Sequence, residues 1–103
     1  MIDYGKLLDL LGDKNLVDKY ITLVKVEIPK ELDQLDKLIK AKEYSEASVV
    51  AHSIKSQCIY MGLDVCAALA LNIEKQTENL QIEQSIEATL KKLKSSLGKY
   101  LSE

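Results

Sequence analysis

The chain has 103 residues, of which 47% are hydrophobic and 29% are charged, and its formal net charge is -2. This length suits one hydrophobic core, so we expect residues 1–103 to form a single domain. Without a basic excess to neutralise phosphates, the chain is not expected to bind nucleic acid. It contains no apolar stretch of membrane-spanning length and no signal-peptide core, which predicts a cytoplasmic protein without membrane insertion.

The composition favours helices, with no Trp, no Phe, one Pro and four Gly. Apolar residues recur at helical spacing along five segments. A short first helix follows Asp3, which can cap it, and ends at Gly12. The apolar positions of this helix are Tyr4, Leu7, Leu8 and Leu11.

A long second helix is expected to start near Asn15. Pro29 falls inside it, removing a backbone donor and crowding the preceding turn. This predicts a kink near Glu27 or a local break, and the pattern favours a kink because it continues in phase on both sides. The apolar positions of this helix are Leu16, Tyr20, Leu23, Val24, Ile28, Leu32, Leu35 and Ile39.

Three further helices follow, and each carries an apolar seam. The third runs from about Glu43 to Met61, with a buried seam of Tyr44, Ala47, Ala51, Ile54, Cys58 and Met61. Gly62 is expected to end this helix in the left-handed conformation, and Asp64 to cap the fourth. The seam positions of the fourth helix are Val65, Leu69, Ile73 and Leu80. The fifth, roughly Ile82 to Leu101, carries Ile86, Leu90, Leu93, Leu97 and Leu101.

Short polar connections between long amphipathic helices imply antiparallel neighbours. The predicted fold class is therefore all-α: an antiparallel up-down four-helix bundle with a short additional N-terminal helix and a Pro29 kink in the long second helix. Cys58 and Cys66 are expected to pack as small hydrophobic residues in a reducing compartment. Because their spacing matches no metal site, no metal centre is predicted.

His52 is the only histidine, and it lies about 130° from the centre of the third helix's seam at roughly 100° per residue. The residues predicted on the same outer half are Ser45, Ser48, Lys55, Ser56, Ile59 and Leu63. The small side chains of Ser48 and Ser56 would leave the imidazole open to a macromolecule. Lys55, one turn along, can place its ammonium beside a group attached to the ring.

An imidazole with a pKa of about 6.5 is substantially neutral and nucleophilic near neutral pH. A carboxylate that accepts a hydrogen bond from one ring nitrogen leaves the other free as the base. Glu74 is the candidate, because a turn at Gly62 would fold the fourth helix back and bring Glu74 to the height of His52. These features predict a nucleophile that carries a phosphoryl group.

Each of these residues also has a simpler interpretation. His52 can be an incidental surface histidine and Lys55 a solvated lysine. Glu74 can be a surface glutamate paired with a nearby lysine, and Ser56 a spacer. Ile59 and Leu63, expected to be partly exposed, form either a docking patch for a partner or part of the core under the first helix. This last alternative stays open at the level of sequence.

The motif residues resemble those of histidine-containing phosphotransfer (HPt) domains of bacterial phosphorelays. The family pattern is approximately Ala-His-x-Leu-Lys-Gly, then a glycine, then a helix ending in Leu-Glu. The corresponding residues here are Ala51-His52-Ser53-Ile54-Lys55-Ser56, Gly62 and Ile73-Glu74. Ser56 replaces the usual glycine, and Ile54 is a core-conserving replacement for leucine.

This resemblance implies that His52 is phosphorylated, Lys55 stabilises the phosphoryl oxygens and Glu74 holds the ring. His52 would accept the group from a receiver-domain aspartate and pass it to an aspartate of another receiver. The implied partners are receiver domains of response regulators or hybrid sensor kinases, which would also supply Mg²⁺. No cofactor is expected on this chain, which we expect to be monomeric.

A non-enzymatic phosphocarrier is expected, because the chain lacks a glycine-rich phosphate loop for ATP. The alternative is a helical adaptor that binds receiver domains or other partners without phosphotransfer, or an unrelated helical scaffold.

Overall fold

The computed structural model describes residues 1–79 and 83–102, and every regular element within them is a helix. In chain order the helices are α1 (Tyr4–Leu11), α2 (Lys14–Lys40), α3 (Tyr44–Tyr60), α4 (Asp64–Glu78) and α5 (Glu83–Leu101). The all-α class is confirmed for these residues. Two expected positions, Leu80 in the fourth helix and Ile82 at the start of the fifth, lie outside the described residues.

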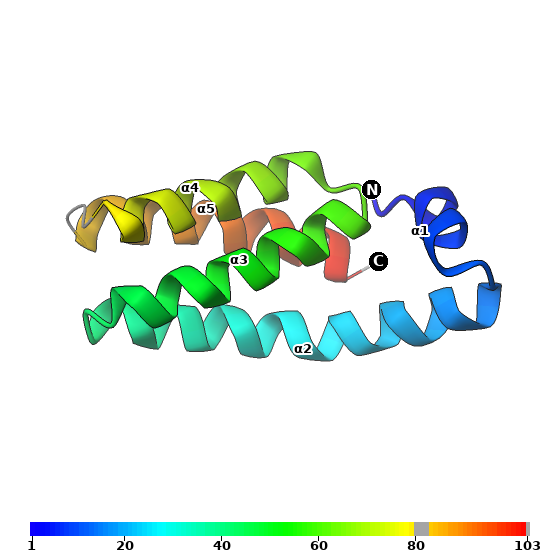
Figure 1. Cartoon of the computed structure of the whole chain (residues 1–103), viewed down its shortest axis with the longest axis horizontal. Helices are drawn as coiled ribbons and strands as arrows, with labels where there is room; N and C mark the ends of the chain where they lie inside the picture. The colour runs from blue at the N-terminus through cyan, green and yellow to red at the C-terminus, as the bar shows by residue number, and fades with distance from the viewer. Residues whose placement is uncertain (80–82, 103) are drawn as a thin grey trace.

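The four long helices lie alongside one another, and successive helices run in opposite directions (Figure 1). α2 and α4 each pack closely against both α3 and α5, whereas no Cα atoms in the described residues of α3 and α5 lie within 8 Å of each other. α3 and α5 are therefore diagonally opposite. The short α1 contacts α2 and α3 at the end of the molecule where α2 begins.

The seam predicted for α3 is buried as expected except at Tyr44, which is only partly buried. Ala47, Ala51, Ile54, Cys58 and Met61 are fully enclosed. Burial of a side chain such as isoleucine contributes about 1.5–3 kcal/mol, so this seam fixes the rotation of α3 strongly. The rotation of α3 in turn decides which of its side chains face outward.

The first half of α2 buries a different stripe from the one expected. Val17 and Ile21 are enclosed, whereas Leu16 is 46% and Leu23 is 56% exposed. Both stripes have helical spacing, so periodicity could not choose between them. The choice follows from tertiary packing, since α1, α3 and α5 surround α2 on particular sides.

Similar corrections apply to α1 and α4. On α1 only Leu7 is buried, and the expected core positions Tyr4 and Leu8 are exposed. On α4 Val65 is 65% exposed, and the adjacent Cys66 is buried in its place. A small residue suits that position because α4 packs closely against α3.

α2 continues from Lys14 to Lys40 without interruption, with Pro29 inside it. The local break at Pro29, which was the alternative to the favoured kink, therefore does not occur. A kink near Glu27 stays a prediction.

The turn between α3 and α4 has the hydrogen-bond pattern of a Schellman motif. Gly62 adopts φ +70°, its N–H donates to Ile59 O at 3.1 Å, and the N–H of Leu63 donates to Cys58 O at 2.9 Å. This motif turns the residue after the glycine back against the helix it ends. Leu63 is accordingly 3% exposed, so the expectation that it is partly exposed is wrong.

Asp64 does not cap α4 as expected. The cap position is occupied by Leu63, whose side chain makes no capping bond, and Asp64 is the first helical residue. A carboxylate in the first turn still interacts favourably with the helix dipole.

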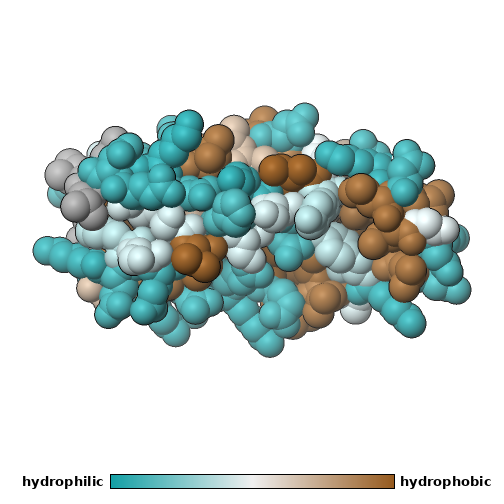
Figure 2. All heavy atoms as spheres, viewed as in Figure 1, coloured by the Kyte–Doolittle hydropathy of each residue, from teal (hydrophilic) through white to brown (hydrophobic). Residues whose placement is uncertain are grey.

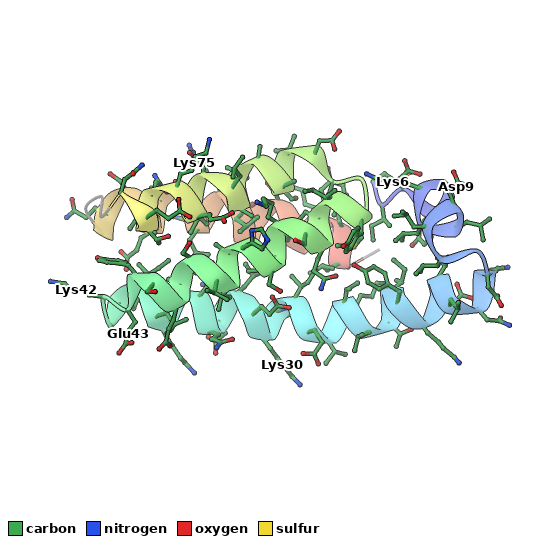
Figure 3. All side chains as sticks on the ribbon, viewed as in Figure 1. Lys6, Asp9, Lys30, Lys42, Glu43 and Lys75 are labelled. Carbon is green, nitrogen blue, oxygen red and sulfur yellow. The ribbon has the colours of Figure 1, made fainter. Side chains whose placement is uncertain are left out.

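The N-terminal segment is attached to this same turn. The N–H of Asp3 donates to Met61 O at 2.8 Å, and its side chain caps α1 by accepting from the N–H of Lys6 at 2.9 Å. The ammonium of Lys6 donates to Ile59 O at 2.7 Å and reaches the end of α3 (Figure 3). A Cβ placed on Gly62 would lie 2.7 Å from the Cβ of Asp3, so this contact requires a glycine.

Apolar side chains also gather on the surface, at the end of the molecule that carries α1 (Figure 2). Leu8, Leu10 and Leu16 are about half exposed there. Among the described helices, none has an apolar stretch of the length that crossing a membrane requires.

The two cysteines are buried and unpaired, as expected. A hydrogen bond with the thiol of Cys66, together with burial, raises the pKa of Cys58 above its ordinary value. Cys58 therefore stays a neutral thiol that packs in the core.

Candidate functional site

His52 lies near the middle of α3 on the side opposite its buried seam. Its side chain is 58% exposed. The buried alanines and Ile54 fix the rotation of the helix, so the imidazole is held outward by the packing of its neighbours. The expected outward position of His52 is confirmed.

The carboxylate of Glu74 on α4 contacts the side chains of both His52 and Lys55. Its Oε2 lies 3.1 Å from His52 Nδ1, and its Oε1 accepts a hydrogen bond from Lys55 Nζ at 3.0 Å. The side chains of Glu74 and Lys55 are only 15% and 19% exposed. One carboxylate thus links the exposed imidazole to a largely enclosed ammonium.

The electrostatics of this cluster fix the tautomer of His52. Burial raises the pKa of Glu74, but the hydrogen bonds and charges of Lys55 and His52 outweigh burial and lower the pKa overall. Glu74 is therefore ionised near neutral pH, and an ionised carboxylate only accepts hydrogen bonds. In the neutral ring, Nδ1 of His52 must therefore carry the proton, and Nε2 then has the free lone pair. No described residue bonds to Nε2.

Glu74 makes both of the contacts considered from the sequence. Glu74 pairs with a nearby lysine, and the same carboxylate also contacts the histidine ring. Lys55 is not a freely solvated lysine, because its ammonium is held against Glu74. A lysine ammonium has three donors, so Lys55 still has donors for a further anion.

Small polar residues stand one turn either side of His52. The hydroxyl of Ser48 donates to Glu78 Oε1 at 3.4 Å, and that of Ser56 donates to the carbonyl of His52 at 3.2 Å. Both serines are half-buried, and their hydroxyls bond close to the helix instead of covering the imidazole. Approach to the ring is therefore not blocked by either residue.

The expected apolar patch beside the site consists of Ile59 without Leu63. Ile59 is 44% exposed, and its neighbour Tyr60 is 48% exposed. Tyr60 also lines a shallow groove between α1, α2 and α3 together with Leu7, Leu10, Leu11 and Tyr20. The sequence did not point to this groove, because its lining residues come from three separate segments.

One polar contact between α2 and α3 was not predicted from the sequence. The hydroxyl of Tyr20 donates to Gln57 Oε1. Burial, with a smaller contribution from Tyr60, raises the pKa of Tyr20 to about 12, so the phenol stays protonated. Tyr20 was expected to be an ordinary apolar position, and nothing in its spacing indicated a partner on α3.

Across the described residues, no group of three or more histidine, cysteine, aspartate or glutamate side chains is placed to hold a metal ion.

The model of the Hpt domain family matches residues 19–99, which is well over half of the chain. This chain belongs to the HPt domain family. The match includes His52, Lys55 and Glu74 and leaves out α1. No curated protein and no solved structure matches the chain.

HPt domains serve histidine phosphotransfer in phosphorelays, as phosphocarriers rather than kinases, and they interact with receiver domains. The family predicted from the motif is confirmed. Membership also gives a reason for an exposed histidine that has a small serine one turn to either side of it.

Proposed function

We propose that this HPt domain accepts a phosphoryl group on Nε2 of His52 from a receiver-domain aspartate and passes it to the aspartate of another receiver. The observation that carries the proposal is the contact between Nδ1 and the Glu74 carboxylate on a ring that is 58% exposed. This contact leaves Nε2 as the basic nitrogen. A free lone pair on an exposed ring is what attack on phosphorus requires.

The neighbouring residues have distinct roles in this proposal. Glu74 orients the imidazole, and Lys55 directs a donor toward the phosphoryl oxygens while it remains bonded to Glu74. Ser48, Ser56 and Ile59 border the surface on which a receiver docks, and the small serines allow its active site to approach. Leu63 supports this surface from below, since its side chain is buried.

The arrangement of the helices supports the same proposal. Taken as an antiparallel up-down bundle with a kink at Pro29, the four long helices hold His52 at mid-length, where a second globular domain has room to dock. Gly62 keeps α4 close to α3, so that Glu74 reaches the ring. Mg²⁺ would be held by the receiver, and this chain would act as a single phosphocarrier domain without ATP-dependent activity of its own.

Transfer from a phosphorylated receiver tests the proposal directly. The wild-type chain and His52→Gln are each incubated with receivers labelled on the phosphoryl group, and the label on this chain is measured after acid and alkali treatment. We expect alkali-stable, acid-labile label on the wild type and none on His52→Gln. Wild-type protein that binds several receivers but takes no label from any would instead establish the adaptor function.

A further inference from the structure

The further inference concerns the proton on Nδ1 of His52, and it rests on the proposed phosphorylation at Nε2. The Glu74 carboxylate lies between Nδ1, 3.1 Å from one oxygen, and Lys55 Nζ, 3.0 Å from the other. Glu74 and Lys55 are largely enclosed, while the ring is exposed. An enclosed carboxylate faces the side of the ring that does not react.

The position of this proton decides how good a leaving group the imidazole is. In the forward step the Nε2 lone pair forms a bond to phosphorus, and the bond from phosphorus to the aspartyl oxygen breaks with its electron pair on that oxygen. The ring then carries phosphorus on Nε2, the proton on Nδ1 and a positive charge. In the onward step a carboxylate oxygen attacks phosphorus, and the electron pair of the breaking bond returns to Nε2 of a neutral imidazole.

No proton has to move in either step, provided that Nδ1 keeps its proton throughout. If the proton were lost, the onward step would have to expel an imidazolate anion, which is a much poorer leaving group than neutral imidazole. The lifetime of phosphohistidine therefore depends on the pKa of Nδ1 in the phosphorylated state.

We infer that Glu74 acts as a positioning residue that retains the proton on Nδ1 of phosphorylated His52 and so keeps the phosphoryl group labile and ready for transfer. Lys55 assists from the other side, because its ammonium holds Glu74 in the charged form. The carboxylate opposite a positively charged ring favours the protonated state. A neutral amide at this position would lack that charge and could instead donate to a deprotonated Nδ1.

The other charged groups around the ring do not provide an alternative. On α4, Glu78 lies one turn beyond Glu74 and is bonded to Ser48, and Lys75 extends from α4 away from α3 (Figure 3). On α3, Lys55 is the charged side chain one turn from the ring, and it contacts Glu74. On α2, the carboxylates of Glu27, Asp33 and Asp36 form ion pairs with lysines of α2 itself, and Asp36 also pairs with Lys94 of α5.

The test uses protein phosphorylated chemically with phosphoramidate, so that it does not depend on any receiver. The pKa of Nδ1 in the phosphorylated protein is read from its ¹⁵N chemical shift as the pH is raised, and the half-life of the phosphoryl group is followed in parallel. The variants are Glu74→Gln, Glu74→Asp and, as a matched control, Glu78→Gln one turn along the same helix. The ¹⁵N spectra also report whether each variant is folded.

We expect Nδ1 of the wild type and of Glu78→Gln to stay protonated well above the ordinary imidazole pKa. In Glu74→Gln the Nδ1 pKa should fall to about 6.5 or below, so that the half-life at pH 8.5 lengthens about tenfold or more, since the protonated fraction drops tenfold per pH unit above the pKa. Glu74→Asp keeps the charge and should give an Nδ1 pKa above that of Glu74→Gln.

The same Nδ1 pKa in the wild type and Glu74→Gln, or no rescue by aspartate, would overturn the inference. This outcome is separate from a failure of receiver transfer, which would overturn the proposed function while leaving the Nδ1 titration intact.

Discussion

At the scale of single residues, the site depends on one carboxylate with two partners. Glu74 contacts the imidazole of His52 and the ammonium of Lys55, and each contact stabilises its ionised form. Because Glu74 and Lys55 are mostly enclosed, the interaction between them is screened less than that of the exposed ion pairs along α2, such as Lys37 with Asp33. The contribution of Glu74 to stability should therefore be measurable.

The stability contributed by Glu74 should depend on pH. Its pKa in the folded chain is lowered from the ordinary value of 4.5, so the contribution is present above pH 4.5 and is lost as the pH falls through the lowered pKa. Urea unfolding of the wild type and Glu74→Gln should show a difference of about 1 kcal/mol at pH 7. This difference should shrink as the pH is lowered from 4.5 through the lowered pKa of Glu74. A difference that stays constant over that range would contradict this assignment.

At the scale of elements, the α3–α4 turn determines whether Glu74 reaches His52. Gly62 meets two requirements there: a left-handed backbone and a close approach by Asp3. Gly12, at the end of α1, shares the left-handed backbone with φ +76° but has open space where a Cβ would be. A comparison of the two glycines therefore distinguishes the cost of a left-handed backbone, which both share, from the cost of the steric overlap with Asp3, which only Gly62 has.

Alanine substitutions at three glycines should therefore have graded effects on the free energy of unfolding. Gly12→Ala should lower it by about 1–2 kcal/mol, the cost of a left-handed alanine. Gly62→Ala should lower it by about 1–3 kcal/mol more, since the new methyl group overlaps Asp3. Gly98→Ala, within α5 and with open space around its Cβ, should raise it by about 0.5–1 kcal/mol. Chemical denaturation of the three variants checks this order, and equal effects at Gly12 and Gly62 would show that the Asp3 contact is unimportant.

At the scale of the whole molecule, His52 and α5 lie on opposite sides of the bundle. His52 lies on α3, and α5 is the helix diagonally opposite. A partner domain that reaches His52 must cover α3 and its neighbours, and it has no need to approach α5. A bulky side chain added to α3 beside His52 should therefore slow transfer, whereas one added to the exposed face of α5 should not.

Ser56→Trp should reduce phosphotransfer from a receiver to His52 by at least about tenfold, because an indole one turn from the ring obstructs docking. A tenfold reduction corresponds to a loss of about 1.4 kcal/mol of docking free energy. Ser95→Trp, at an exposed position on α5, is the matched control and should leave transfer unchanged. The initial rate of transfer is measured for both, with helical content followed by circular dichroism. Normal transfer by a folded Ser56→Trp would mean that Ser56 does not border the docking surface.

Much of this arrangement was predictable from the sequence, because it is determined by interactions between residues that are close together in the chain. The helical class, the buried seam of α3 and the left-handed Gly62 follow from periodicity and backbone sterics, which operate within a few residues. The pairing of His52 with Glu74 followed from the turn between their helices and from the resemblance of the motif. Some errors fall where two apolar stripes share one helix, as with Leu16 and Val17 on α2, and others fall at the α3–α4 turn, as with Leu63 and Asp64.

The amino-acid sequence by itself determined that the chain is helical, that one histidine faces outward and which family it belongs to, since these depend on residue types and short spacings. Tertiary structure alone decided which stripe of α2 is buried, that Leu63 is turned inward, and that Glu74 contacts Lys55 and His52 at once. The physical reason is that burial and ion pairing depend on which surfaces meet, and the helices that meet are brought together from distant parts of the chain.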